Sequence, residues 1–162
     1  MGLVIVVIQR CRSASVAALG RTVAEIGAGM LVLVGVERGD DAAVAEDVAR
    51  KVASLRIFSD AEGKMNLGLS DVAGSVLAVS QFTLAGDVRK GRRPSFDRAL
   101  AGPEAERLFD AFVSRLRAEA PTKTGIFGAD MQVDLCNDGP VTFIYQKRAG
   151  EEPAAERRGH RQ

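Results

Sequence analysis

The side chains most able to take part in chemistry follow directly on an apolar run. Val76–Val79 are apolar without alternation, which predicts a strand buried on both faces, and Ser80, Gln81 and Thr83 come soon after. Hydroxyl and amide groups at the end of a strand can hold or process the tip of a bound polyanion. The alternative is ordinary, because such groups usually form hydrogen bonds with the local backbone.

A cationic loop follows this polar strand end. It holds four positive side chains within five positions, Arg89, Lys90, Arg92 and Arg93. Such a loop can bind phosphates while the strand end holds the terminal group, although most charge runs are simply solvated. The whole chain has a formal net charge of +1, so these cations form one local patch and do not indicate a protein that coats nucleic acid.

Imidazole chemistry is not expected in the core of this protein. The single histidine, His160, lies in a polar stretch near the end of the chain. A Ser-His-Asp triad, a Cys-His pair and a zinc site with histidine ligands are therefore all disfavoured. A hydrolase with this sequence would use backbone donors, a hydroxyl group or a group that its substrate supplies.

No metal or other cofactor is expected. Cys11 and Cys136 stand far apart and have no metal-ligand spacing, so they are interpreted as reduced thiols of a cytoplasmic protein. Asp130, Asp134 and Asp138 are interpreted as strand-edge and turn carboxylates. The first apolar run of the chain is too short to span a membrane or to form the core of a signal peptide.

A second polar cluster, Asn137–Thr142, has the sequence NDGPVT. A Gly-Pro pair between two strands is most often a plain turn. The functional alternative is that the peptide between Gly139 and Pro140 is cis and presents two main-chain carbonyl groups side by side, because a cis bond before proline costs little. The sequence leaves both interpretations open.

Two helices and several short strands are predicted to position these clusters. One helix is Ala42–Ser54, after an acidic cap, and the other starts at Gly102 and ends before Pro121. The predicted strands are Leu3–Ile8, Arg12–Ala18, Val23–Ile26, Met30–Val36, Arg56–Phe58, Lys64–Leu69, Val76–Val79, Gln132–Cys136 and Val141–Tyr145. Because helices and strands do not alternate regularly, we predict an α+β fold with a curved, mixed, barrel-like sheet. Residues 1–146 form one predicted domain, and residues 147–162 a polar tail predicted to be disordered.

The two polar clusters resemble the signature motifs of a known enzyme family. SQFTL at Ser80–Leu84 and NDGPVT at Asn137–Thr142 are similar to the motifs of the D-aminoacyl-tRNA deacylases. Further segments resemble that family in the same order: IQR at Ile8–Arg10, LVLVGVERGD at Leu31–Asp40, LRIFSDAEGKMN at Leu55–Asn66, GDVRKGRRPSF at Gly86–Phe96 and TGIFGADMQVDLCNDGPVT at Thr124–Thr142. The resemblance covers residues 1–146. Its departures, which are a longer first strand, Ala85 and the tail, leave the signature residues untouched.

The resemblance implies an enzyme of chiral proofreading. Such an enzyme hydrolyses the ester bond of D-aminoacyl-tRNA, and of glycyl-tRNA mischarged on tRNA(Ala). The family resemblance further implies a homodimer with the active site at the subunit interface. The Gly139-Pro140 pair of one protomer, in the cis form and held by Arg10, would enter the partner's pocket and reject L-aminoacyl groups by clash.

The resemblance also implies roles for the polar strand end and the cationic loop. The pocket for the terminal adenosine and the aminoacyl group would be lined by Ser80, Gln81, Phe82, Thr83, Phe127 and Met131. The loop Arg89–Arg93 would contact phosphates of the acceptor stem, which agrees with its charge.

Two mechanisms for the ester hydrolysis stay open. Thr83 could act as a nucleophile, but the sequence offers no histidine in the core to activate its hydroxyl. The favoured alternative is attack by water assisted by the 2′-hydroxyl of the terminal ribose, with backbone N–H groups of Phe82 and Thr83 stabilising the oxyanion. One rival function is a tRNA-binding dimer without catalysis, which predicts tRNA binding without ester turnover. A second is a purely structural dimerisation protein, which predicts neither.

Overall fold

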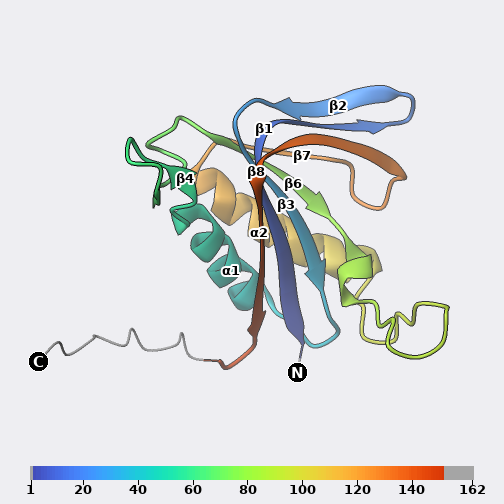
Figure 1. Ribbon diagram of the computed structural model, residues 1–162. Helices are drawn as coiled ribbons and strands as arrows, with labels where there is room; N and C mark the ends of the chain where they lie inside the picture. Colours follow the sequence, from blue (N-terminus) through green and yellow to red (C-terminus); the bar gives the residue numbers. More distant parts are fainter. Residues whose placement is uncertain (1, 152–162) are drawn as a thin grey trace, which may run out of the picture.

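A strongly curved mixed sheet with two helices packed against one face makes up the fold (Figure 1). This computed structural model describes residues 2–151 of the 162-residue chain. The elements are β1 Leu3–Ala18, β2 Arg21–Ile26, β3 Gly29–Val36, α1 Ala42–Ser54, β4 Phe58–Ser59, β5 Met65–Leu67, β6 Ser75–Ser80, the 3-10 turn η1 Phe82–Ala85, α2 Gly102–Glu119, β7 Thr122–Thr124 and β8 Met131–Arg148. The main sheet has the order β2-β1-β3-β6-β7, with β8 also paired to β1, and β4 and β5 form a separate small sheet. The predicted α+β class and mixed sheet are confirmed.

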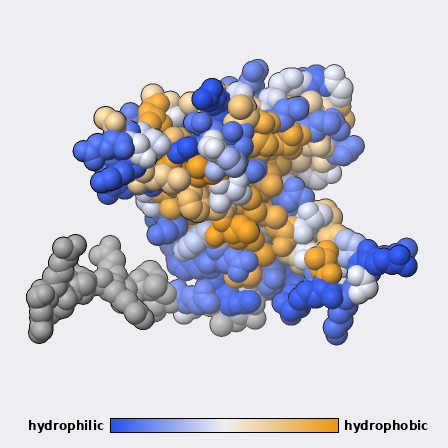
Figure 2. Space-filling view, in the orientation of Figure 1, coloured by the Kyte–Doolittle hydropathy of each residue, from blue (hydrophilic) through white to orange (hydrophobic). Residues whose placement is uncertain are grey.

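Strand β1 is one continuous strand, although the sequence predicted two. Residues 4–11 pair with β3 and residues 14–18 pair with β2, while β8 follows β1 along nearly its whole length. Irregular register near residues 9–13 bends this pair of strands. Figure 2 shows hydrophobic surface in the middle of the view, where β1 and β8 lie in Figure 1. Phe143 and Ile144 of β8 are among the exposed large hydrophobic residues.

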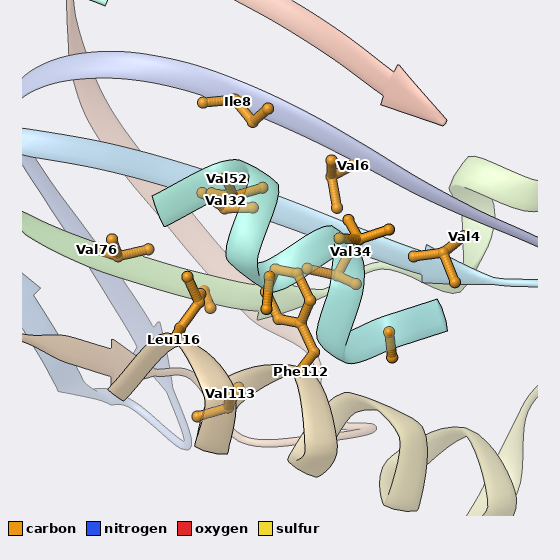
Figure 3. Close-up of a cluster of buried hydrophobic side chains, with 14 of the residues drawn as sticks. Val4, Val6, Ile8, Val32, Val34, Val52, Val76, Phe112, Val113 and Leu116 are labelled. Carbon is orange, nitrogen blue, oxygen red and sulfur yellow. The ribbon is translucent and has the colours of Figure 1, made fainter. Parts of the chain in front are cut away.

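Strand β6 is buried on both faces, as its uninterrupted apolar sequence predicted. It lies between β3 and β7 and is parallel to both. On one face, Val76 and Ala78 join the main core, which the sheet shares with α1 and α2 (Figure 3). On the other face, Leu77 and Val79 join a second apolar cluster with residues of β1, β2 and β3. The curled sheet encloses this second cluster, which gives the fold its barrel-like form.

The two helices follow their sequence signals. Asp41 caps α1, because its carboxylate accepts a hydrogen bond of 2.9 Å from the backbone N–H of Val44. Proline occupies the first turn of α2, and this helix ends at Glu119, shortly before Pro121. Both apolar faces pack into the main core, where Phe112 of α2 is fully buried (Figure 3).

The last strand extends beyond the predicted domain boundary at residue 146. Strand β8 runs to Arg148, and the Lys147 ammonium binds the carboxylate of Asp47 on α1 at 3.0 Å. Lys147 and Arg148 therefore belong to the sheet and not to the predicted tail. The part of that tail from residue 152 lies outside the described residues. Neither described helix is both long and apolar enough to cross a membrane.

Candidate active site

A cavity of about 410 Å³ opens where β6 ends. Its walls come from the ends of β3 and β6, from η1, from the start of α2 and from the segment between β7 and β8. The start of α2 contributes Ala101, Gly102 and Ala105, which the sequence did not single out because small residues carry no chemical signal. Since β3 and β6 are parallel, their carboxyl ends meet at one edge of the sheet, where ligands commonly bind.

The structure brings together five residues that were predicted to bind substrate. The cavity is lined by Ser80, Gln81, Phe82, Phe127 and Met131, which come from two segments far apart in the sequence. Thr83 belongs to the same turn as Phe82 but is not among the lining residues. The substrate contacts of all six residues stay predictions.

The polar strand end becomes the short turn η1, which the sequence analysis did not predict. The backbone N–H of Gln81 donates to the carbonyl of Val34 at 2.7 Å, which ties the start of the turn to β3. The N–H groups of Phe82 and Thr83 are the first two of the turn and have no acceptor within it. The side-chain amide of Gln81 donates to the Thr83 hydroxyl oxygen. The turn thus offers two backbone donors, and its one hydroxyl is already an acceptor.

Two aromatic contacts fix the rings around the cavity. The ring of Phe82 lies 5.2 Å from that of Phe96, which closes the cationic loop, and Phe127 lies 6.3 Å from Phe109 of α2. Gly86 leaves room for the first contact, because an added Cβ there would lie 3.0 Å from the Phe96 ring. Phe96 therefore connects the cationic loop to the cavity wall, a role that its sequence context did not reveal.

The Gly139–Pro140 peptide is cis and lies in a bulge of β8. Gln9 is opposite Thr142 and Cys11 is opposite Asn137, so β8 carries three more residues than β1 over this interval. Of the two interpretations that the sequence left open, the plain turn between two strands is therefore wrong, since one strand continues on both sides of the bulge. Asn137 braces the bulge, because its side-chain oxygen accepts a hydrogen bond of 2.7 Å from the N–H of Val141.

Arg10 holds the base of this bulge. Its Nε donates to the carbonyl of Asp138 and its NH1 donates to the carbonyl of Ile57, both at 2.8 Å. Arg10 is buried, whereas Gly139 and Pro140 are exposed. None of these three residues lines the cavity of the same chain. The structure therefore presents two separate features, a cavity and a rigidly tied, exposed bulge.

The cationic loop carries one paired and three unpaired charges. Nε of Arg89 donates to Asp87 at 2.9 Å and its NH2 donates at 2.6 Å. This pair raises the pKa of Arg89 and holds the pKa of Asp87 well below its usual range. Lys90, Arg92 and Arg93 are exposed and form no ion pair with any described residue. The loop projects at the lower right of Figure 1, and its surface in Figure 2 is largely hydrophilic.

A buried carboxyl group, that of Asp40, lies outside the cavity lining. One of its oxygens accepts a hydrogen bond of 2.8 Å from the N–H of Glu37, and the other has no hydrogen-bond partner among the described residues. Burial raises the pKa of Asp40 to about 6, and the charge of Glu37 adds to the increase. Across residues 2–151, no three or more His, Cys, Asp or Glu side chains are arranged to hold a metal ion.

Comparison with known proteins gives one consistent family. Residues 7–146 match the family model described as D-Tyr-tRNA(Tyr) deacylase. The D-aminoacyl-tRNA deacylase of Pelobacter propionicus is 61% identical over 142 residues, which span 87% of this chain and 98% of that protein. The enzyme of the same name from Escherichia coli O1:K1 is 55% identical over 143 residues, spanning 88% of this chain and 99% of that one.

Solved structures share the fold. The c-Myc DNA unwinding element binding protein superposes with a TM-score of 0.82 and is 38% identical, over 93% of this chain and 99% of that chain. A probable eukaryotic D-amino acid tRNA deacylase superposes with a TM-score of 0.76 at 19% identity, over 90% of this chain and all of that chain. At that identity the second likeness concerns the fold alone.

Proposed function

The chain belongs to the D-Tyr-tRNA(Tyr) deacylase family and is a hydrolase of the ester bond in D-aminoacyl-tRNA, and we propose that it serves as a chiral proofreading enzyme of the cytoplasm. One observation carries the proposal. The SQFTL segment lies at the end of β6, in the wall of a cavity that is large enough for a nucleoside. The backbone N–H groups of Phe82 and Thr83 in this segment have no acceptor within η1. Each reaction adds one water molecule across the ester and releases a D-amino acid and tRNA with a free 3′-hydroxyl.

The terminal adenosine occupies the cavity in this proposal. Phe127 and Met131 supply apolar surface for the base, while Ser80 and Gln81 supply hydrogen-bonding groups at the end of β6. Phe82 closes the wall on the side of the cationic loop, where Phe96 supports its ring. The aminoacyl ester then lies next to η1, with its carbonyl oxygen toward the N–H groups of Phe82 and Thr83.

Those two backbone donors carry the catalysis that we propose. They stabilise the negative charge that develops on the carbonyl oxygen when water attacks, and they need no movement to do so. The 2′-hydroxyl of the ribose assists the water, because no described acid or base contacts the Thr83 hydroxyl. That hydroxyl accepts a hydrogen bond from Gln81, which supports a positioning role for Thr83 over a nucleophilic one.

Selection against L-aminoacyl groups comes from a second protomer. In a homodimer, the Gly139-Pro140 bulge of one protomer enters the cavity of the other and occupies the space that an L side chain would need. The proposal is supported by the exposure of Gly139 and Pro140, by their position outside their own cavity, and by the exposed Phe143 and Ile144 on the same strand. Glycine has no side chain to reject, so glycyl-tRNA(Ala) is a second expected substrate.

The cationic loop holds the acceptor stem. Arg89, Lys90, Arg92 and Arg93 lie on an exposed loop that is linked to the cavity wall through Phe96. Phosphate contacts of this kind position a nucleic acid without reading its sequence, which suits an enzyme that must accept many tRNAs.

The decisive experiment measures release of D-tyrosine from D-tyrosyl-tRNA beside an L-tyrosyl-tRNA control. We expect turnover of the D-ester with no turnover of the L-ester above its spontaneous hydrolysis. Binding of tRNA without release of D-tyrosine would instead identify a tRNA-binding dimer without catalysis. Hydrolysis of both esters at similar rates would contradict the selection by the Gly139-Pro140 bulge.

A further inference from the structure

A second pocket adjoins the cavity and has no role in the proposed function. This side pocket has a volume of about 390 Å³ and is lined by Arg38, Gly39, Ala99, Leu100, Ala101 and Glu104. Leu100 and Ala101 line the cavity as well, so the cavity and the side pocket meet across these two residues, just before α2 begins. A ligand that is too long for the cavity can therefore continue into the side pocket.

Arg38 is the one cation among the described residues that line the cavity or the side pocket. Its backbone is tied to the shared wall, because its N–H donates to the carbonyl of Arg98 at 2.8 Å, and the N–H of Leu100 donates to the carbonyl of Val36 at 3.0 Å. Its side chain is exposed and forms no ion pair with any described residue. The guanidinium makes one long hydrogen bond, of 3.5 Å from Nε to the carbonyl of Ala99, and its two terminal nitrogen atoms are available to an anion.

The substrate supplies an anion next to the cavity. A phosphodiester joins the 5′ position of the terminal adenosine to the rest of the tRNA and carries a negative charge. In the proposed arrangement, the base lies against Phe127 and Met131, and the 3′ ester lies at η1. The 3′ and 5′ positions are on opposite sides of a ribose, so the phosphate points away from η1.

The walls of the cavity leave one direction for this phosphate. The ends of β3 and β6 contribute buried valine side chains and close the cavity on their side. The wall that holds the base carries Asp130, the one charged residue of the cavity lining, whose carboxylate repels a phosphate. The start of α2 remains, and there the chain of the substrate passes over Leu100 and Ala101 toward Arg38.

We propose that Arg38 binds the phosphate on the 5′ side of the terminal adenosine, and that the side pocket holds the penultimate nucleotide. The inference rests on the proposed function and extends its substrate site by one nucleotide. A guanidinium can donate two N–H groups to the two free oxygen atoms of a phosphodiester. Such a contact positions the 3′ end without reading its sequence, and a charged hydrogen bond at an exposed site changes an affinity by about tenfold.

The test removes one charge from the substrate. D-tyrosyl-tRNA is compared with the same ester in which a neutral methylphosphonate replaces the phosphodiester before the terminal adenosine. The value of kcat/KM is measured for both esters with wild type, Arg38→Gln, Glu104→Gln and a matched control, Arg21→Gln. The control removes an exposed arginine outside the cavity and the side pocket, and Glu104→Gln removes the negative charge of the side pocket. Circular dichroism and thermal unfolding verify that each variant is folded.

We expect wild type and Arg21→Gln to prefer the native ester by about tenfold, and Arg38→Gln to show a preference below about threefold. Glu104→Gln should hydrolyse the native ester at least as well as wild type, because it loses a charge that repels the phosphate. The inference is overturned if Arg38→Gln keeps the wild-type preference, if wild type shows no preference, or if Glu104→Gln loses as much activity as Arg38→Gln. If wild type hydrolyses neither ester, the proposed function itself fails; if it hydrolyses D-tyrosyl-tRNA without these differences, only the inference fails.

Discussion

Thr83 shows how the contacts of a single residue separate two mechanisms. The SQFTL segment has two hydroxyl groups that could act as nucleophiles, those of Ser80 and Thr83. The Thr83 hydroxyl accepts a hydrogen bond from Gln81, and Thr83 does not line the cavity. The backbone N–H groups of the same turn are independent of the side chain at this position. The proposed mechanism therefore uses the main chain of Thr83, a residue whose side chain suggests a catalytic role in the sequence.

Replacing Thr83 by alanine tests this view. We expect Thr83→Ala to keep kcat within about tenfold of wild type, because the backbone donors remain. A substrate ending in 2′-deoxyadenosine should lose at least about 100-fold, the usual contribution of a group that assists proton transfer. Single-turnover release of D-tyrosine measures both effects. Loss of nearly all activity in a folded, tRNA-binding Thr83→Ala protein would make Thr83 the nucleophile.

Asp40 predicts a pH dependence of stability. Its pKa is about 6 in the folded protein against an ordinary value of 3.8, so between these values the folded state binds more protons than the unfolded chain. Stability contributed by Asp40 is therefore lost as pH rises from about 4 to 6. Asp40→Asn should raise the free energy of unfolding by about 1–3 kcal/mol at pH 7.5 and by much less at pH 4.

Urea unfolding at the two pH values measures this difference. Asp41→Asn is the matched control, since asparagine caps a helix as well as aspartate does and Asp41 is exposed. An equal change for Asp40→Asn at pH 4 and pH 7.5 would rule out titration of this carboxyl as the cause.

The four positive side chains of the cationic loop are not equivalent. Arg89 is neutralised by Asp87, whereas Arg92 forms no ion pair with a described residue. Arg92→Ala should weaken tRNA binding several-fold and lower the slope of log K against log salt by about 0.7–1. Arg89→Ala should have a smaller effect on both, because Asp87 already occupies its guanidinium. Filter binding of tRNA at salt concentrations from about 50 to 200 mM measures both quantities. Equal loss of affinity and equal slopes for the two variants would contradict this ranking.

The elements also show what the sequence alone could predict. Helix α1 was predicted because its apolar residues recur at helical spacing, and strand β6 because its apolar residues form an uninterrupted run. Both elements bury those residues. The continuity of β1 and β8 was missed, since polar residues at a bend resemble a break between strands. The turn η1 and the three-residue strand β7 have no periodic pattern, so only their tertiary pairing defines them.

The candidate site was predictable to a similar degree. The SQFTL segment and the Phe127–Met131 segment were expected to meet, and both line the cavity. The wall from α2 was not expected, because it consists of small side chains that sequence reasoning cannot tell from any other helix start. The pairing of Arg89 with Asp87 was also missed, since a charge run does not show which of its members are neutralised.

At the scale of the whole molecule, the cavity and the bulge are separate in one chain. A mixed form of the proposed homodimer can therefore show which chain each bulge serves. One protomer would carry both Gly139→Ala and Ala101→Trp, and its partner would be wild type. A Cβ on Gly139 would lie 2.6 Å from a Val141 side-chain carbon, so the bulge must shift, and a tryptophan at Ala101 fills the cavity. The only open cavity then belongs to the wild-type protomer.

We expect this mixed dimer to hydrolyse L-tyrosyl-tRNA, because its open cavity faces the altered bulge of the partner. The wild-type dimer should not hydrolyse that ester. Differently tagged protomers, purified through both tags, provide the sample for the assay. Rejection of L-tyrosyl-tRNA by the mixed dimer, with Gly139→Ala homodimers accepting it, would mean that each bulge serves its own chain.

The extra residues of β8 have a further consequence. Strands β1 and β8 are paired on both sides of these residues. The extra residues are therefore an insertion in a strand that otherwise pairs with β1 along its length. A short insert of this type can be exchanged between related proteins while the frame that carries it stays the same. Under the proposed selection by this bulge, the stereochemical preference depends on a few backbone atoms, so we expect that it can be transferred with the insert, separately from the residues that break the ester.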